Sequence, residues 1–238
     1  YAPNIDSLVS QGCNLIVTVG FALSAATLAA AEANPDIEFA LIDDAADADF
    51  NGTPDFDNTK PIVFNTAQAA FLVGYAAASY SKSGIVATWG GMNFPTVTIF
   101  MDGFAQGVAY YNSENGTAVQ VLGYDPASPD TATFTGGFEA NDVAKSTAQN
   151  FIDQGADILL PVGGPIYQSA VAAITDSGKD IALIGVDADL FETDPSTQDI
   201  IFTSILKGIK SATSAVVADA AAGNFSNEAY VGTLENDG

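Results

Sequence analysis

Two aliphatic segments in the second half of the chain constrain its fold most. DILLPVGG begins at Asp157 and DIALIGVD at Asp180. Each is a short apolar run without polar alternation, and the runs stop at Gly163-Gly164 and at Asp187. Such runs are typical of strands buried on both faces, as found in parallel sheets flanked by helices. Because ligands of these sheets bind beyond the carboxyl ends of the strands, we expect these small and acidic residues at a ligand-binding edge.

The rest of the chain alternates in the same way between apolar runs and stretches with helical patterning. The predicted strands are 13–20, 37–43, 61–67, 85–91, 118–124, 158–162, 181–186 and 200–206. Alternation of this kind predicts an α/β fold in which parallel strands are joined by right-handed helical crossovers. The polar segment NSENGT (112–117) interrupts the pattern, which suggests two lobes.

We expect each lobe to hold a parallel sheet flanked by helices, with a ligand between the lobes. The predicted lobe 1 comprises residues 1–115 plus 207–232, and the predicted lobe 2 comprises residues 116–206. The expected hinges lie near 112–117, 188–207 and 232–238. A single nucleotide-binding domain is less favoured, because the first strand is followed by VGFALS rather than a G-x-G-x-x-G turn.

Composition excludes several classes of function. The chain has 29 acidic residues, six lysines, no arginine and no histidine, and a formal net charge of -23. A nucleic-acid-binding surface needs clustered Lys and Arg, so we expect no nucleic-acid partner. Without histidine there is no Ser-His-Asp or Cys-His machinery and no His-ligated metal. Cys13, the one cysteine, lies in an apolar run, so we expect its thiol to be buried in the core. We expect no catalytic residue, no cofactor and no metal.

Five stretches, taken in order, resemble the basic membrane protein family of ABC-transporter substrate-binding lipoproteins. They are VTVGFALSAATLAAA (17–31), AAFLVGYAAASYSKSGIVATWGG (69–91), FMDGFAQGV (100–108), IGVDADL (184–190) and FTSILKGIKSA (202–212). The best understood members of this family bind purine nucleosides. The resemblance implies a periplasmic-binding-protein type I clamshell with three strands crossing between its lobes. It also implies a receptor that captures a nucleoside in the cleft between the lobes and delivers it to an ABC permease, without catalysis.

The resemblance also bears on the ends of the chain and on its location. Family members begin with a lipoprotein signal, a lipidated cysteine and a first strand, none of which precedes Tyr1, and their last strands are missing after Gly238. We therefore expect an internal fragment, truncated at both ends. It would come from a cell-surface or periplasmic lipoprotein whose only membrane contact is an anchor outside this chain. A sheet without its first strand exposes unpaired edges, so we expect the isolated fragment to be unstable or prone to aggregate.

The resemblance assigns roles to three residues. Phe138 matches the aromatic residue of the family's G-S-F-x-D segment, which stacks on the nucleobase; Gly137 stands where the family often has serine. Asp187 corresponds to a carboxylate that accepts hydrogen bonds from the ribose hydroxyls, and Lys207 is placed beside it as a partner. The alternatives are a core phenylalanine, a helix-capping carboxylate and a surface lysine, the last of which suits Lys210 better.

Four further residues are candidate ligand contacts. Gly163 and Gly164 let the backbone approach a ligand, although a plain strand-to-helix turn explains them equally well. Phe21 follows the strand 13–20 at the matching edge of lobe 1, and its neighbour Gly20 shares the loop. Trp89, near the end of the strand 85–91, is a weaker candidate for the same role.

Other functions stay open on the sequence alone. The same clamshell could bind a sugar or an autoinducer, or serve as a ligand sensor. Sugar-binding proteins of this fold often use arginine. The absence of arginine therefore favours a ligand with a large apolar face. A small-molecule enzyme would need an acid–base pair without histidine, such as Asp187 with Lys207 or Asp44.

Overall fold

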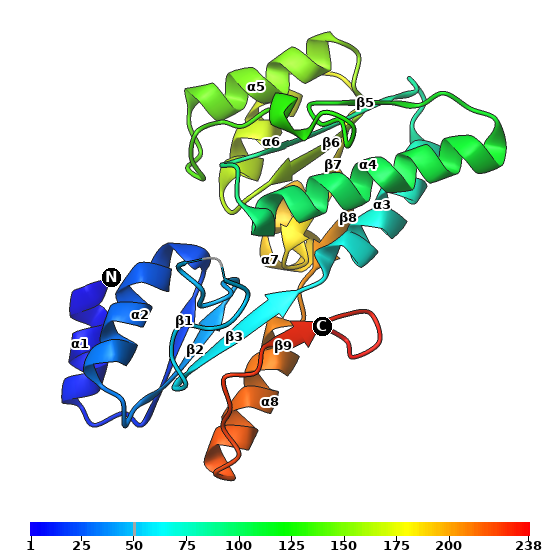
Figure 1. Ribbon diagram of the computed structural model, residues 1–238. Helices are drawn as coiled ribbons and strands as arrows, with labels where there is room; N and C mark the ends of the chain where they lie inside the picture. Colours follow the sequence, from blue (N-terminus) through cyan, green and yellow to red (C-terminus); the bar gives the residue numbers. More distant parts are fainter. Residues whose placement is uncertain (50) are drawn as a thin grey trace. The chain divides into compact units, whose positions relative to one another are not determined.

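The structure is a computed structural model that describes residues 1–49 and 51–238. The chain divides into two compact units, one made of residues 1–65 and 208–238 and the other of residues 66–207 (Figure 1). Each unit contains its own parallel sheet, which confirms the predicted α/β class. Residue 50, in the polar and acidic segment 44–60 for which we expect a loop, lies outside the described residues.

The first unit has a four-stranded parallel sheet with helices on both faces. Across the sheet the order is β1 (Leu15–Val19), β2 (Glu38–Ile42), β3 (Thr59–Phe64) and β9 (Tyr230–Gly232). The helices are α1 (Ala2–Ser10), the short η1 (Phe21–Leu23), α2 (Ser24–Ala33) and α8 (Ile209–Ala221). Helices α1 and α2 pack with Phe39 and Leu41, whereas α8 packs with Ala40 and Ile42. Because adjacent side chains of a strand point to opposite faces, β2 is covered on both sides.

The second unit has a five-stranded sheet in which all strands are parallel. Across the sheet the order is β5 (Gln120–Leu122), β4 (Ile85–Gly90), β6 (Ile158–Val162), β7 (Ala182–Asp187) and β8 (Ile201–Leu206). The helices are α3 (Thr66–Tyr80), α4 (Pro95–Asn115), η2 (Pro129–Thr131), α5 (Asp142–Asp153), α6 (Ile166–Ser177), α7 (Leu190–Thr193) and η3 (Pro195–Thr197). Strand β6 is buried along its whole length, as its uninterrupted apolar run predicts.

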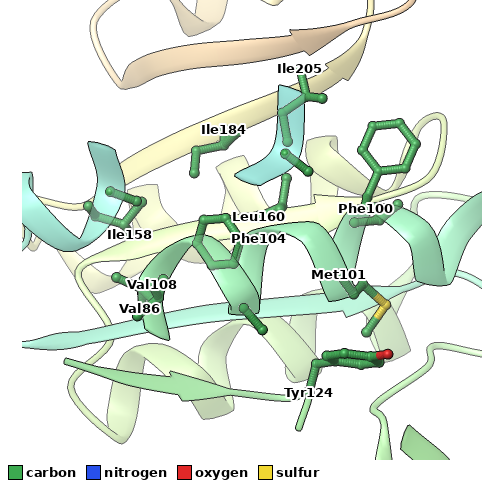
Figure 2. Close-up of a cluster of buried hydrophobic side chains, with 14 of the residues drawn as sticks. Val86, Phe100, Met101, Phe104, Val108, Tyr124, Ile158, Leu160, Ile184 and Ile205 are labelled. Carbon is green, nitrogen blue, oxygen red and sulfur yellow. The ribbon is translucent and has the colours of Figure 1, made fainter. Parts of the chain in front are cut away.

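Two hydrophobic clusters cover the two faces of this sheet. On one face, Phe100 and Phe104 of α4 pack with Leu160 and Ile184 (Figure 2). The other face is formed with helices α5 and α6, and Trp89 lies there, fully buried with its ring centroid 5.3 Å from that of Phe151. Trp89 therefore belongs to the core, and its weaker prediction as a ligand contact at the sheet edge is wrong.

Helices α3 and α4 touch through glycines. A Cβ atom added at Gly74 of α3 would lie 2.1 Å from the carbonyl oxygen of Phe104 in α4, and one added at Gly107 would lie 2.1 Å from that of Phe71. The missing side chains thus let the two backbones come into direct contact. This contact ties α3 to α4 and to the sheet beneath them.

Gly74→Ala should lower the stability of the protein. An alanine in a helix interior is normally more stable than glycine by roughly 0.5–1 kcal/mol, but overpacking at a closed contact costs about 1–3 kcal/mol. We expect the clash with Phe104 to dominate, and a lower midpoint of thermal unfolding to reveal it. Ser79→Ala, at an exposed position of the same helix, should change the midpoint little. A midpoint that rises in Gly74→Ala would contradict this packing.

The boundary between the units differs from the predicted one. Residues 66–115 were expected in lobe 1, but they belong to the second unit, where β4 pairs with β5 and β6. The polar segment 112–117 was misleading because it ends a helix rather than linking two domains. Gly116 adopts a left-handed conformation (φ 64°) after α4, and Asn112 hydrogen-bonds through its side chain to the backbone of Val119. The chain passes between the units after residues 65 and 207.

No helix among the described residues combines the length and the apolar character needed to cross a membrane.

Candidate functional site

The carboxyl edge of the sheet in the second unit gathers most of the predicted site residues. Gly163 directly follows β6, Asp187 ends β7, and Lys207 directly follows β8. Strands β6, β7 and β8 are neighbours and run parallel, so their carboxyl ends lie at one edge. In parallel sheets this edge is where ligands bind.

Asp187 and Lys207 form an ion pair at this edge. The Nζ atom of Lys207 lies 2.9 Å from Oδ1 of Asp187, and the backbone N–H of Lys207 donates to the carbonyl oxygen of Asp187 at 3.0 Å. The lysine side chain is 6% exposed and that of the aspartate 37%. A surface lysine is therefore the wrong description of Lys207, because its ammonium is withdrawn from solvent and held by a carboxylate that solvent still reaches. Removing one partner of such a pair leaves the other charge uncompensated.

Phe100 completes the surroundings of the lysine. Its ring, buried in the cluster beneath the sheet edge, lies with its centroid 5.1 Å from the Nζ atom of Lys207. A cation over an aromatic face gains roughly 0.5–2 kcal/mol, with the larger values at desolvated sites. Phe100 was not predicted as a site residue, because no local sequence pattern indicates which of the core phenylalanines lies under a particular lysine.

The backbone of Asp187 is unusual. Its φ of 69° lies in the left-handed region, which aspartate tolerates better than most residues but which still carries strain. Asp189, two residues on, instead caps α7, since its side chain accepts a hydrogen bond from the N–H of Phe191 at 3.0 Å. The alternative role of a helix cap therefore applies to Asp189, while Asp187 faces Lys207.

Phe138 lies on the ends of two neighbouring strands. A Cβ atom added at Gly163 would come within 2.4 Å of Cδ1 of the Phe138 ring, and one added at Gly91 would come equally close to the same atom. The ring is only partly buried, so it is neither a core side chain nor fully exposed. The space beside Gly163 is thus taken by this ring, whereas Gly164 is exposed with nothing within 4 Å of its Cβ position.

Gly91 is a second residue that the sequence analysis missed. The sequence did carry a signal for it, because a glycine doublet follows the apolar run of β4 just as one follows that of β6. Both doublets precede a helix. A glycine doublet in this position can form a plain turn or a surface on which an aromatic ring packs, and the sequence alone does not distinguish the two.

Tyr124 adds a neutral polar group beside the same edge, just after β5. Burial raises the pKa of its phenol, and the nearby negative charge of Asp102 raises this pKa further. The phenol O–H donates to Oδ1 of Asp102 at 3.4 Å. The tyrosine consequently stays protonated at neutral pH and acts as a hydrogen-bond donor.

Gly20 and Phe21 lie at the carboxyl edge of the other sheet, in the first unit. Gly20 has a left-handed φ of 97°, and its N–H donates to the carbonyl oxygen of Ile42 at 2.9 Å. Phe21 begins η1 and is partly buried. Both occupy the predicted edge position, and their contact with a ligand stays a prediction.

Asp44 at this edge has a structural role. Its Oδ1 accepts hydrogen bonds from the hydroxyl of Ser24 and from the N–H of Ala46, both at 2.8 Å. These bonds fix the loop after β2. The arrangement gives no support to the acid–base role considered for Asp44, because both bonds use its carboxylate to order the loop.

Three carboxylates of the acidic loop in the first unit come close together. Oxygen atoms of Asp47, Asp49 and Asp55 lie within 4.8 Å of one another, which is close enough to hold a cation. The same carboxylates also accept backbone hydrogen bonds, including one from Gly52 to Asp47 at 2.7 Å and one from Ala48 to Asp55 at 3.0 Å. Each of the three side chains thus accepts at least one hydrogen bond within the loop.

Comparison with known proteins bears on the family and the fold. Residues 1–235 match the family described as ABC transporter substrate-binding protein PnrA-like. The chain is 28% identical to basic membrane protein B of Borreliella burgdorferi over 209 residues, which cover 88% of this chain and 56% of that protein. It thus spans about half the length of the curated relatives it matches.

Solved structures support the same assignment. An ABC transporter solute-binding protein from Aeropyrum pernix K1 superposes with a TM-score of 0.80 at 26% identity, covering all of this chain and 62% of that one. A transcriptional activator of the comK gene from Bacillus halodurans has a TM-score of 0.72 at 22% identity, covering 96% and 71% of the two chains. The first likeness confirms the expected periplasmic-binding-protein type I fold, and the second reflects that fold alone. The chain therefore belongs to the PnrA-like family of ABC transporter substrate-binding proteins, a family of solute binders rather than enzymes.

Proposed function

We propose that this chain forms the solute-binding part of an ABC importer receptor that captures a nucleoside, with purine nucleosides preferred, and delivers it to the permease. The observation that carries the proposal is the Asp187–Lys207 ion pair at the carboxyl edge of the sheet in a chain of this family. The receptor acts outside the cytoplasmic membrane, held there by a lipid anchor. It needs no cofactor and turns over no substrate.

The ion pair suits the ribose of a nucleoside. A carboxylate accepts hydrogen bonds from two adjacent hydroxyls, and Asp187 is exposed enough to reach a solute. Lys207 holds that carboxylate in place and keeps the local charge neutral, so the pair favours an uncharged sugar over an anion. A charge-assisted hydrogen bond to the carboxylate is also stronger than one between neutral groups.

Phe138 suits the base. A nucleobase that stacks on an aromatic ring gains about 1–3 kcal/mol, and the gain depends little on which base it is. The ring packs against the core cluster on one side and lies on the backbone of Gly91 and Gly163, and part of it stays accessible. A purine offers the larger face, which favours purines over pyrimidines. Gly20 and Phe21 of the first unit are proposed as further contacts.

Calorimetric titration of the full-length protein tests this function directly. The ligands are guanosine, adenosine, inosine, uridine, ribose and glucose. We expect the purine nucleosides to bind more tightly than uridine and both sugars, because only they combine a diol with a large flat base. Binding of glucose or ribose alone would leave the fold unchanged but overturn the ligand. Absence of binding by all six would overturn the proposal in favour of another small solute.

A further inference from the structure

The Phe138 ring packs on two glycines at the ends of neighbouring strands, Gly91 and Gly163, which together we call its seat. In the β4–β6 pairing Gly90 lies opposite Val162, so Gly91 and Gly163 both follow the last paired residues of the ladder. The N–H of Gly91 donates to the carbonyl oxygen of Val162 at 3.0 Å. A Cβ atom at either glycine would approach Cδ1 and Cε1 of Phe138 to 2.4 and 2.6 Å, distances that real Cβ atoms do not show.

The two glycines are needed for different reasons. Gly163 has a φ of 133°, a conformation that strains any residue with a side chain, so its backbone alone requires glycine. Gly91 does not have a positive φ, so any L-residue could adopt its backbone conformation. Only its surroundings exclude a side chain: the Phe138 ring, and the carbonyl oxygen of Gly137 at 2.7 Å from the Cβ position.

The segment that carries Phe138 is fixed against the end of β4 by its backbone. The N–H of Gly90 donates to Thr133 at 3.0 Å, the N–H of Thr135 donates to Gly90 at 3.0 Å, and the N–H of Gly136 donates to Gly91 at 2.9 Å. An isolated bridge between Gly90 and Phe134 continues the sheet there. The ring consequently sits at the end of a short hydrogen-bonded extension of the sheet rather than on a free loop.

We propose that Gly91 is a positioning residue for base recognition: its missing side chain, with that of Gly163, holds the Phe138 ring in the orientation that receives the base. This inference rests on the proposed function. A ring fixed before the ligand arrives loses no rotamer freedom on binding, and such preorganisation is a main source of affinity. A methyl group at position 91 would lift the ring from its seat and remove that advantage.

Gly91→Ala should weaken guanosine binding about 10-fold, as measured by calorimetry on the full-length protein. If Gly91 acts through the ring, Gly91→Ala should cause little further loss of affinity in a protein that already lacks the Phe138 ring. Adding Gly91→Ala to Phe138→Ala should therefore lower the affinity by less than about 2-fold, since interacting residues are not additive. Gly137→Ala is the matched control, because Gly137 also lacks a positive φ and its Cβ position has nothing within 4 Å. It should bind guanosine as the unmodified protein does.

Two results would overturn the inference. In the first, Gly91→Ala binds guanosine as tightly as the unmodified protein. In the second, Gly91→Ala lowers the affinity equally in the presence and in the absence of the Phe138 ring, which would indicate a general structural defect. A crystal structure of the ligand-free Gly91→Ala variant separates this failure from failure of the proposed function. We expect the ring displaced by about 1 Å or more, and a ring that stays in place would refute the seat itself. A protein that binds no nucleoside would instead overturn the proposed function, and the recognition role of Gly91 with it.

Discussion

Lys207→Met should lower the affinity for guanosine by about 100-fold. The substitution keeps most of the apolar stem of the side chain but removes the ammonium that lies 2.9 Å from Asp187 and 5.1 Å from the ring centroid of Phe100. Without it, the carboxylate loses the partner that fixes its orientation, and truncating one member of such a pair costs about 2–5 kcal/mol. Calorimetric titration of the full-length variant with guanosine measures the change.

Lys210→Met provides the control for this prediction. Lys210 lies three residues further on, at an exposed position in α8, so its loss removes one positive charge without touching Asp187. Its affinity for guanosine should stay within about 2-fold of the unmodified protein. If both variants weaken binding equally, the effect of Lys207 is one of net charge, and the assignment of Lys207 to the ribose is wrong. Thermal unfolding of both variants checks that each remains folded.

Phe138→Ala should lower the affinity for guanosine by about 5- to 150-fold, the equivalent of one lost stacking interaction of about 1–3 kcal/mol. The ring is partly buried and lies on Gly91 and Gly163, so its removal opens the seat. The loss should be larger for guanosine than for uridine, because the purine has the larger stacking face. Titrations with both nucleosides measure this difference.

Phe202→Ala tests whether any aromatic loss in this unit has the same effect. Phe202 lies in β8 near its amino end, where its ring stacks on Tyr80 with centroids 4.8 Å apart. Its substitution should reduce stability but leave the preference between guanosine and uridine unchanged. A Phe138→Ala variant that binds both nucleosides as before would show that the ring does not receive the base.

Much of the fold follows from local pattern. The uninterrupted apolar run of β6 predicted a strand buried on both faces, and the run of β7 predicted its neighbour. The family resemblance placed Lys207 beside Asp187, and the structure shows the two side chains as an ion pair.

The remaining features depend on contacts between distant segments. Gly91, Phe138 and Gly163 come together only after β4 and β6 pair and the intervening segment returns along β4. The position of Phe100 under Lys207 likewise depends on how α4 packs on the sheet. The unit boundary was misplaced for the same reason: the Asn and Gly residues of a helix end have the composition of a linker, and only strand pairing distinguishes the two.

A crystal structure of the full-length protein grown with guanosine tests the central claim most directly. We predict that the ribose hydroxyls lie about 3 Å from the carboxylate of Asp187, within hydrogen-bond distance, while Lys207 remains paired with it. The base should lie parallel to the ring of Phe138. Guanosine bound away from the carboxyl edge of this sheet, or with its ribose distant from Asp187, would contradict the account.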